Sequence, residues 1–332
     1  MMKTYMFILK MAAGILVFLG AFAAAMIFGA ADTTLNDVWL AMTGAELSDK
    51  ATMIREIRLP REVAAIAVGA ALAVSGAIMQ GLTRNPLADP GLIGLTAGGT
   101  AALAITLAFI PGVNYFGIMI ACFIGCAVGA AMVLGIGSMK KGGFSPMRIV
   151  LAGAAVSAFL FAVSEGVGIT FKLSKDVSMW TSGGMAGTSW SQLQFIIPFI
   201  AGGILISLML SRQLTILSLS EEVAVGLGQK TVAIKGILFV VIVLLAGAGV
   251  ALAGNLAFVG LMVPHIVRAI VGTDYRYIIP MSVIMGASFM LLADTVGRTV
   301  NAPYETPVAA VVAVLGLPFF LFIVRKGGRH FT

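Results

Sequence analysis

The chain has 332 residues, of which 60% are hydrophobic and only 11% are charged. Soluble domains carry roughly 25% charged residues and 45–50% apolar ones, so the hydrophobic core of a single soluble domain could not bury this excess of apolar residues. With a mean hydropathy of +1.06, the composition excludes a soluble globular protein and predicts a polytopic membrane protein. The net charge of +7 does not imply nucleic acid, because lysine and arginine collect on the cytoplasmic side of membrane proteins.

The first apolar run, residues 11–31, follows a basic start that contains Lys3 and Lys10. A signal peptide has an apolar stretch of about 7–15 residues, and this run is longer, so we interpret it as a retained first helix. Cleavage after Ala31 is the alternative.

Nine further apolar runs follow, which gives ten membrane-spanning helices in one transmembrane domain, 1–332, and an all-α fold. The eighth of the ten is short and is interrupted by Pro264. The nine runs are 62–82, 92–110, 115–138, 147–170, 192–210, 231–252, 256–272, 277–297 and 305–324.

The distribution of charge predicts how the chain is oriented. With the N-terminus inside, 14 of the 21 lysines and arginines fall on the cytoplasmic side. The positive-inside rule therefore favours two cytoplasmic termini, with the 211–230 loop inside and the 171–191 loop outside. Arg58, Arg61 and Arg298 then lie outside, against the usual bias.

Two apolar segments resemble each other. Residues 69–76 read GAALAVSG, residues 247–254 read GAGVALAG, and each is followed ten residues later by a proline, Pro86 or Pro264. The offset of 178 residues spans five helices, and an odd number of helices inverts the second copy, as in many transporters. The alternative is a chance likeness between Gly/Ala-rich helices.

The nearest approach to a nucleotide-binding pattern begins in the 218–228 loop. The run Gly226–Thr231 fails the G-x-x-x-x-G-K-S/T pattern because Gln229 separates Gly228 from Lys230. Serine and acidic residues instead predict the start of a short helix there. Its valines would be partly exposed, which suits a peg that docks on another protein; a plain amphipathic connector is the alternative.

Several motifs, in this order along almost the whole chain, resemble the FecCD-type (BtuC-like) permeases of ABC importers for iron-siderophores, haem and cobalamin. They are Arg58-Leu-Pro-Arg61, Gly76-Ala-Ile-Met-Gln80, Arg84-Asn-Pro-Leu-Ala-Asp-Pro-Gly91, Leu151-Ala-Gly153, Trp180 with Gly183, Gly184, Gly187 and Trp190, Glu221–Gly228, Phe258-Val-Gly-Leu-Met-Val-Pro-His-Ile-Val-Arg268, Asp294–Arg298 and Leu315-Gly-Leu-Pro-Phe319.

The resemblance implies a type II ABC importer permease in the cytoplasmic (inner) membrane of a prokaryote. It implies a second permease subunit, in a homodimer or a heterodimer, together with two cytoplasmic ATP-binding subunits and an extracytoplasmic substrate-binding protein. The expected cargo is an iron-siderophore, with haem or cobalamin as the alternative. The chain itself would be a translocation subunit, not an enzyme, and would carry no cofactor or metal, because ATP and Mg would bind the partner ATPase.

The resemblance also implies roles for individual residues. Arg58, Arg61 and Arg298 match positions that bind acidic residues of the binding protein, a task that suits the planar fork of arginine; interfacial anchoring is the alternative. The 218–228 loop matches the coupling helices that contact the ATPase. The residues expected to carry this coupling are Ser220, Glu221, Glu222, Ala224, Leu227 and Gly228.

The remaining candidates concern the pathway. By resemblance, Ser145, Pro146 and Met147 stand at an inner gate, and the external segment with Trp180, Gly183 and Gly184 forms a short helix at the outer mouth. Glu165 is different, because ionisable groups within a span are costly and tend to face cavities. It could meet the cargo or pair with a neighbour, and the sequence leaves both open.

Two rival functions find little support. An ion-coupled secondary transporter needs several ionisable residues within its helices, and apart from Glu165 there is little. An intramembrane enzyme lacks an H-E-x-x-H motif, and only His265 is available within the spans.

Overall fold

The computed structural model describes residues 2–29, 33–43, 48–138 and 146–327, and no β-strand occurs among them. The elements are α1 (Met2–Ile27), α2 (Leu35–Thr43), α3 (Asp49–Met53), a π-helical turn (Ile54–Arg58), α4 (Leu59–Thr83), a 3₁₀ turn (Pro90–Ile93), α5 (Leu95–Phe109), α6 (Tyr115–Ser138), α7 (Pro146–Thr170), α8 (Ser174–Thr181), α9 (Trp190–Met209), α10 (Ser211–Leu219), α11 (Glu221–Gly226), α12 (Thr231–Ala253), α13 (Val259–Val271), α14 (Tyr275–Thr299) and α15 (Val308–Gly327).

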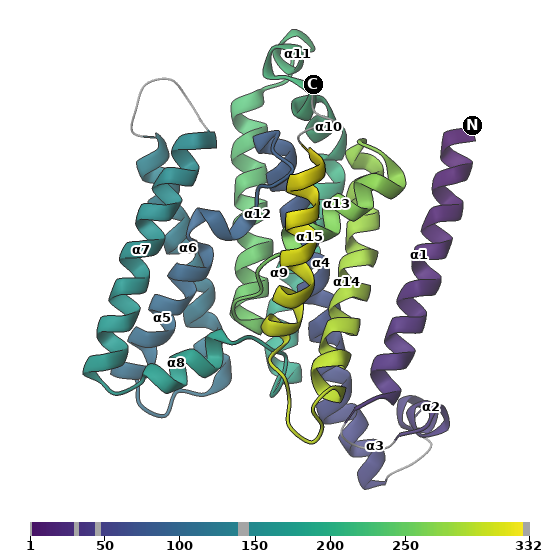
Figure 1. Cartoon of the computed structure of the whole chain (residues 1–332), viewed down its shortest axis with the longest axis vertical. Coiled ribbons are helices and arrows are strands. Elements are labelled where there is room, and N and C mark those ends of the chain that lie inside the picture. Colours follow the sequence, from purple (N-terminus) through teal and green to yellow (C-terminus); the bar gives the residue numbers. More distant parts are fainter. Residues whose placement is uncertain (1, 30–32, 44–47, 139–145, 328–332) are drawn as a thin grey trace.

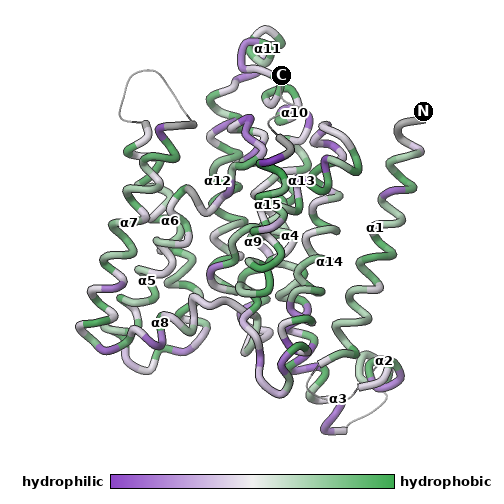
Figure 2. The backbone as a smooth tube through the Cα atoms, in the orientation of Figure 1, coloured by the Kyte–Doolittle hydropathy of each residue, from purple (hydrophilic) through white to green (hydrophobic). Residues whose placement is uncertain are grey.

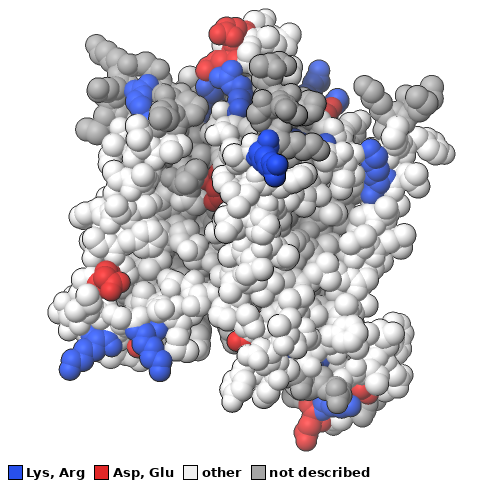
Figure 3. Space-filling model, in the orientation of Figure 1, with Lys and Arg blue, Asp and Glu red and all other residues white. Residues whose placement is uncertain are grey.

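The long helices lie side by side and give the molecule two distinct ends (Figure 1). We call one the α11 end, which holds α10, α11, the start of α1 and the end of α15, and the other the α8 end, which holds α2, α3 and α8. Hydrophobic residues dominate the long helices between these ends (Figure 2), and most charged side chains visible in Figure 3 gather at the ends. This distribution is typical of a membrane-spanning bundle.

Eight of the described helices are long and apolar enough to cross a bilayer, and α5 and α13 are shorter apolar helices. The fold is therefore an all-α polytopic membrane fold, as the sequence predicts. The predicted spans 92–110 and 256–272 begin too early, because α5 starts at Leu95 and α13 at Val259. A helix of 15 residues, the length of α5, reaches only about 22 Å, less than the hydrocarbon thickness of roughly 30 Å.

Backbone breaks explain why these two helices are short. Gly94 precedes α5 with φ of 77°, and Phe258 precedes α13 with φ of 69°, a left-handed conformation that interrupts a helix. The non-helical residues before each helix lie among α4, α7 and α12, where protein and a cavity surround them. Irregular backbone at membrane depth is tolerated in such surroundings.

Helix α4 is the buried centre of the fold. It packs against α14, α12 and α13, and 89% of its membrane-spanning window is buried. Glycines permit the closest approaches: an added Cβ would overlap the carbonyl oxygen of Gly286 at Gly69, and that of Gly260 at Gly76. Such small residues let membrane helices gain van der Waals contact without a hydrophobic effect between them.

The two similar segments occupy related places. Residues 69–76 lie in α4, which runs from the α8 end to the α11 end, and residues 247–254 end α12, which runs the opposite way. Gly69 faces Gly286 of α14, and Gly247 faces Cys126 of α6. The helix that carries each segment is followed by non-helical residues and then by a short helix, which is the arrangement that an inverted repeat would give.

A first prediction concerns this packing. Gly76→Ala should lower stability by about 1–3 kcal/mol, because the new methyl group overlaps the Gly260 carbonyl in a well-packed core. Thermal unfolding in detergent measures the loss. Gly202→Ala on α9 is the matched control, since a Cβ there meets nothing within 4 Å. Equal melting temperatures for the two variants would contradict the packing described.

Candidate functional site

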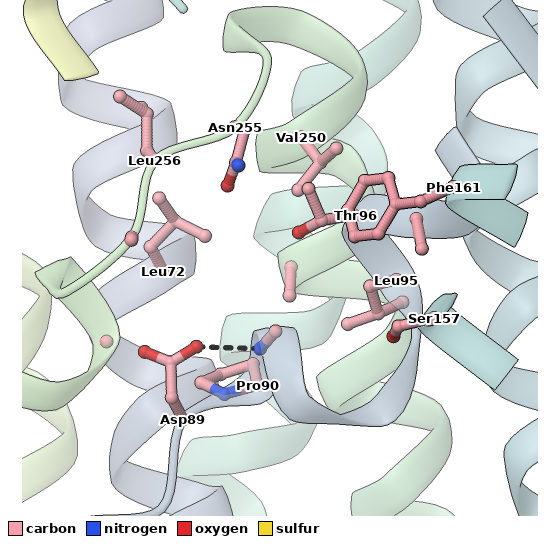
Figure 4. Close-up of a pocket in the computed structure, with 15 residues that line it drawn as sticks. Leu72, Asp89, Pro90, Leu95, Thr96, Ser157, Phe161, Val250, Asn255 and Leu256 are labelled. Atoms are coloured by element: carbon pink, nitrogen blue, oxygen red, sulfur yellow. Dashed lines mark hydrogen bonds between the residues drawn. The ribbon is translucent and has the colours of Figure 1, made fainter. Parts of the chain in front are cut away.

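A cavity lies where α4, α5, α7, α12 and α13 converge, and it has a volume of about 190 Å³ (Figure 4). Asp89 and Asn255, from the two non-helical segments, face it from opposite sides. The Asp89 carboxylate accepts a hydrogen bond from the Gly91 N–H at 2.7 Å, which starts the 3₁₀ turn before α5. Asp89 and Asn255 thus reach the cavity at the point where both helices are broken, and Thr96 and Ser157 add further polar groups to its lining.

A second cavity, of about 400 Å³, extends from the first toward the α8 end and shares Phe161 and Asn255 with it. Glu165 lines this cavity and is exposed. Among the described residues no ion pair involves Glu165. The other polar lining residues are Thr100, Ser164, Ser174, Ser178, Thr181, Ser182 and Asn255.

A short helix, α8, lies at the α8 end, but it ends at Thr181 and holds only Trp180 of the three residues expected in it. The prediction is wrong for Gly183 and Gly184, because their positive φ angles place them in a non-helical segment that folds over the end of α12. Gly183 and Gly184 have φ of 74° and 149°, and the Gly184 N–H donates to the Ala253 carbonyl at 2.9 Å. These residues and the half-buried Trp180 line a third cavity, of about 520 Å³, at the α8 end. The predicted mouth residues therefore lie together at one end of the bundle.

The three arginines expected to face a binding protein lie near the α8 end, but they are held by groups of this chain. Arg58 and Arg298 are only 6% exposed. Arg58 donates to the Met26 carbonyl at 2.6 Å and to the Thr33 hydroxyl. Burial of a guanidinium costs several kcal/mol unless it is paired, so these contacts stabilise the local fold.

Arg61 and Arg298 are bound by three carboxylates that sequence reasoning missed. Arg61 forms a bidentate pair with Asp294, both contacts at 2.9 Å, and also donates to Glu305 at 2.7 Å. Arg298 pairs with Glu62 at 2.6 Å and with Asp294 at 3.0 Å. Glu62 and Asp294 are fully buried, whereas the Glu305 side chain is 48% exposed. The Arg61 hydrogen bond holds the pKa of Glu305 below its usual range.

We call Arg58, Arg61, Arg298, Glu62, Asp294 and Glu305 the arginine network. It joins α1, α4 and α14 to the segment before α15, and it contains three guanidinium groups and three carboxylates, of which Arg61 and Arg298 form the ion pairs. The sequence did contain a signal for the ion pair between Asp294 and Arg298, because residues four apart lie on one face of a helix. Nothing comparable linked Arg61 to residues more than 200 positions away.

The α11 end presents the short helix predicted in the 218–228 loop. The Ser220 hydroxyl accepts from the Val223 N–H at 3.0 Å and caps α11. Glu221 pairs with Lys235 of α12 at 2.7 Å, and this hydrogen bond holds the pKa of Glu221 below its usual range. Gly228, with φ of 76°, ends the loop.

Exposure within this loop is uneven. Val223, Val225 and Leu227 are 45%, 58% and 65% exposed, as the sequence predicts for a docking peg. Ala224 is fully buried and faces inward, so it can support the helix but offers no surface. Of the residues expected at an inner gate, Pro146 and Met147 begin α7, and Ser145 lies outside the described residues.

Comparisons with known proteins agree on the family. The model of the FecCD transport family matches residues 15–326. The chain is 44% identical to the iron(3+)-hydroxamate import system permease protein FhuB of Bacillus subtilis, over 98% of this chain and 85% of that protein. It is 39% identical to the Fe(3+)-citrate import system permease protein YfmD of the same organism, over 90% and 89%. A solved inward-facing metal-chelate type ABC transporter superposes with a TM-score of 0.84 at 27% identity, over 96% and 99%.

The arginine network generates a second prediction. Asp294→Asn should lower stability by about 3–5 kcal/mol, because it leaves Arg61 and Arg298 with too few buried carboxylates. The readout is again the melting temperature in detergent. Lys50→Ala should leave the melting temperature unchanged, because the ion pair between Lys50 and Asp37 lies at the surface and the Lys50 side chain is 56% exposed. A similar small effect for both variants would show that the network is not structural.

Proposed function

Because this chain belongs to the FecCD transport family, whose members are permease subunits of ABC importers, we propose that it moves an iron-siderophore across the cytoplasmic membrane. The observation that carries the proposal is the line of cavities from the α8 end to the broken helices. Cavities at the interface of inverted, discontinuous helices are where transporters bind substrate. The hydroxamate permease among the relatives makes a ferric hydroxamate the first cargo to test.

The α11 end is proposed to face the cytoplasm. Arg84, Arg212, Lys230, Arg276 and Arg325 belong to elements that begin or end there. A concentration of arginine and lysine near span ends marks the cytoplasmic side, so both termini would be cytoplasmic. The α8 end, with its large cavity mouth, would then receive cargo from outside.

A second permease subunit would complete the pathway. Helix α15 carries exposed apolar side chains, and only 22% of its membrane-spanning window is buried within this chain. The α7 window is 33% buried, and the same helix presents Glu165 to the cavity. A partner packed on these two faces would enclose Glu165 between subunits, away from lipid, which lowers the cost of its charge. The exposed residues of α15 are Val314, Leu315, Leu317, Leu321, Phe322 and Val324.

Coupling to separate ATPase subunits is proposed to act through α11. The exposed Val223, Val225 and Leu227 would enter an apolar groove of the partner. Glu221 ties this helix to Lys235 on α12, and α12 runs to the cavity, where it contributes Val250. A push on α11 would therefore tilt α12 and move the broken segment that follows it, which is how alternating access would be driven.

Docking of a substrate-binding protein is proposed to centre on Arg61. Its exposed partner Glu305 is a carboxylate at the surface, as an acidic residue of a docking protein would be. Such a residue could replace Glu305 and keep the charge of the arginine network balanced. Arg58 and Arg298 are buried, so their role would be to hold Arg61 and its neighbours in place. They would contact the binding protein only after the helices around them had moved.

Reconstitution tests the function. Vesicles containing this chain, its second permease and the ATPase should take up ferric hydroxamate only when ATP and the loaded binding protein are both supplied. Val225→Asp should reduce ATPase attachment about tenfold or more, since it removes about 1.5–3 kcal/mol of apolar burial. Lys230→Gln, at an exposed residue just after the loop, controls for a general effect. Uptake by this chain alone, driven by an ion gradient, would refute the proposal.

Docking gives a separate prediction. Arg61→Ala should weaken the affinity of the binding protein, whereas Glu305→Gln should strengthen it by a few-fold, because it removes the internal competitor for Arg61. Titration calorimetry or surface plasmon resonance measures both, with Lys50→Ala as a control at the same end. If Glu305→Gln weakens binding as much as Arg61→Ala does, the exchange of carboxylates is wrong.

A further inference from the structure

Helix α2 carries an apolar face that its own fold does not cover. Leu35, Trp39 and Met42 are 63%, 68% and 56% exposed. Their spacing of four and then three residues places them on one side of the helix. Val38 and Ala41 form the adjoining buried side and pack with Met26, Ala51 and Ile54.

The helix is fixed at both ends, so this face is presented rigidly. At the start, the Thr34 N–H donates to the Asp37 carboxylate at 2.9 Å, and the Asp37 N–H donates back to the Thr34 hydroxyl at 3.2 Å. At the end, Arg55 Nε donates to the Ala41 carbonyl at 2.5 Å. These bonds satisfy backbone groups that would otherwise be orphaned at helix ends. A rigid display of three large apolar side chains in water would be unfavourable.

The surroundings of α2 indicate what covers the face. The helix follows α1 at the edge of the bundle (Figure 1), and only 11% of the α1 membrane-spanning window is buried within the chain. Leu16 and Leu19 of α1, and Phe28 directly after it, are exposed, so the apolar exterior of the span continues past the end of the helix (Figure 2). A short capped helix with a tryptophan on its apolar face is typical of a membrane–water interface.

We propose that α2 lies in the plane of the membrane interface at the α8 end, with Leu35, Trp39 and Met42 inserted among the phospholipids. The occupant of this face is the bilayer. Because α2 is joined through Arg55 to the turn that carries Arg58, the insertion also fixes the depth of the arginine network. The proposal needs the chain to span a membrane, but does not depend on its cargo.

Tryptophan fluorescence tests the insertion, because the chain has only three tryptophans. With Trp180→Phe and Trp190→Phe, the emission comes from Trp39. In phosphatidylcholine vesicles we expect blue-shifted emission, strong quenching by lipids brominated near the carboxyl end of their chains, and little quenching by aqueous iodide. Emission typical of water, quenched by iodide and not by brominated lipid, would overturn the proposal.

A second pair of variants keeps the test decisive if the tryptophan variant does not fold. Cys122 and Cys126 are buried, so a new surface cysteine can be labelled selectively. A polarity-sensitive probe on Met42→Cys should report an apolar environment in vesicles, and the same probe on Asn36→Cys, on the polar side of α2, should report water. Water at both positions would overturn the proposal. So would an apolar signal at position 42 that appears only when a soluble partner protein is added.

Discussion

The close approach of α4 to its neighbours is the constraint on which the rest of the structure depends. Gly69 and Gly76 bring the backbone of α4 against the carbonyls of Gly286 and Gly260, where no side chain would fit. Gly260 lies in the first turn of α13, so this contact also fixes the broken segment that contains Asn255. Without it, neither the cavity nor the line of cavities toward the α8 end would be held open at that place.

Charge forms the second constraint. The arginine network sits where α1, α4 and α14 meet the segment before α15, and its buried carboxylates make the arginines possible there. Only Glu305 is substantially exposed among the acidic members. A carboxylate of another protein could therefore take the place of Glu305 at the surface while the buried Glu62 and Asp294 stay paired with the arginines. This replacement is the physical basis of the docking proposal.

The sequence predicted those features that depend on local pattern. Hydropathy located the spans, and a serine with following glutamates located α11, because both signals lie within one element. It placed the starts of α5 and α13 too early, because apolar residues continue through the backbone breaks at Gly94 and Phe258. It could not find the partners of Arg61, since Asp294 and Glu305 meet it only in the folded bundle. Tertiary packing decides which carboxylate pairs with an arginine that is far from it in the sequence.

The proposed transport requires that the cavity between the broken helices open alternately to the two sides of the membrane. Ser157 lines that cavity, and a cysteine there would be readily distinguished from the buried Cys122 and Cys126. In the assembled transporter, the account predicts that a membrane-impermeant thiol reagent labels Ser157→Cys from one side without nucleotide and from the other side with ATP bound. Labelling from the same side in both states would contradict it.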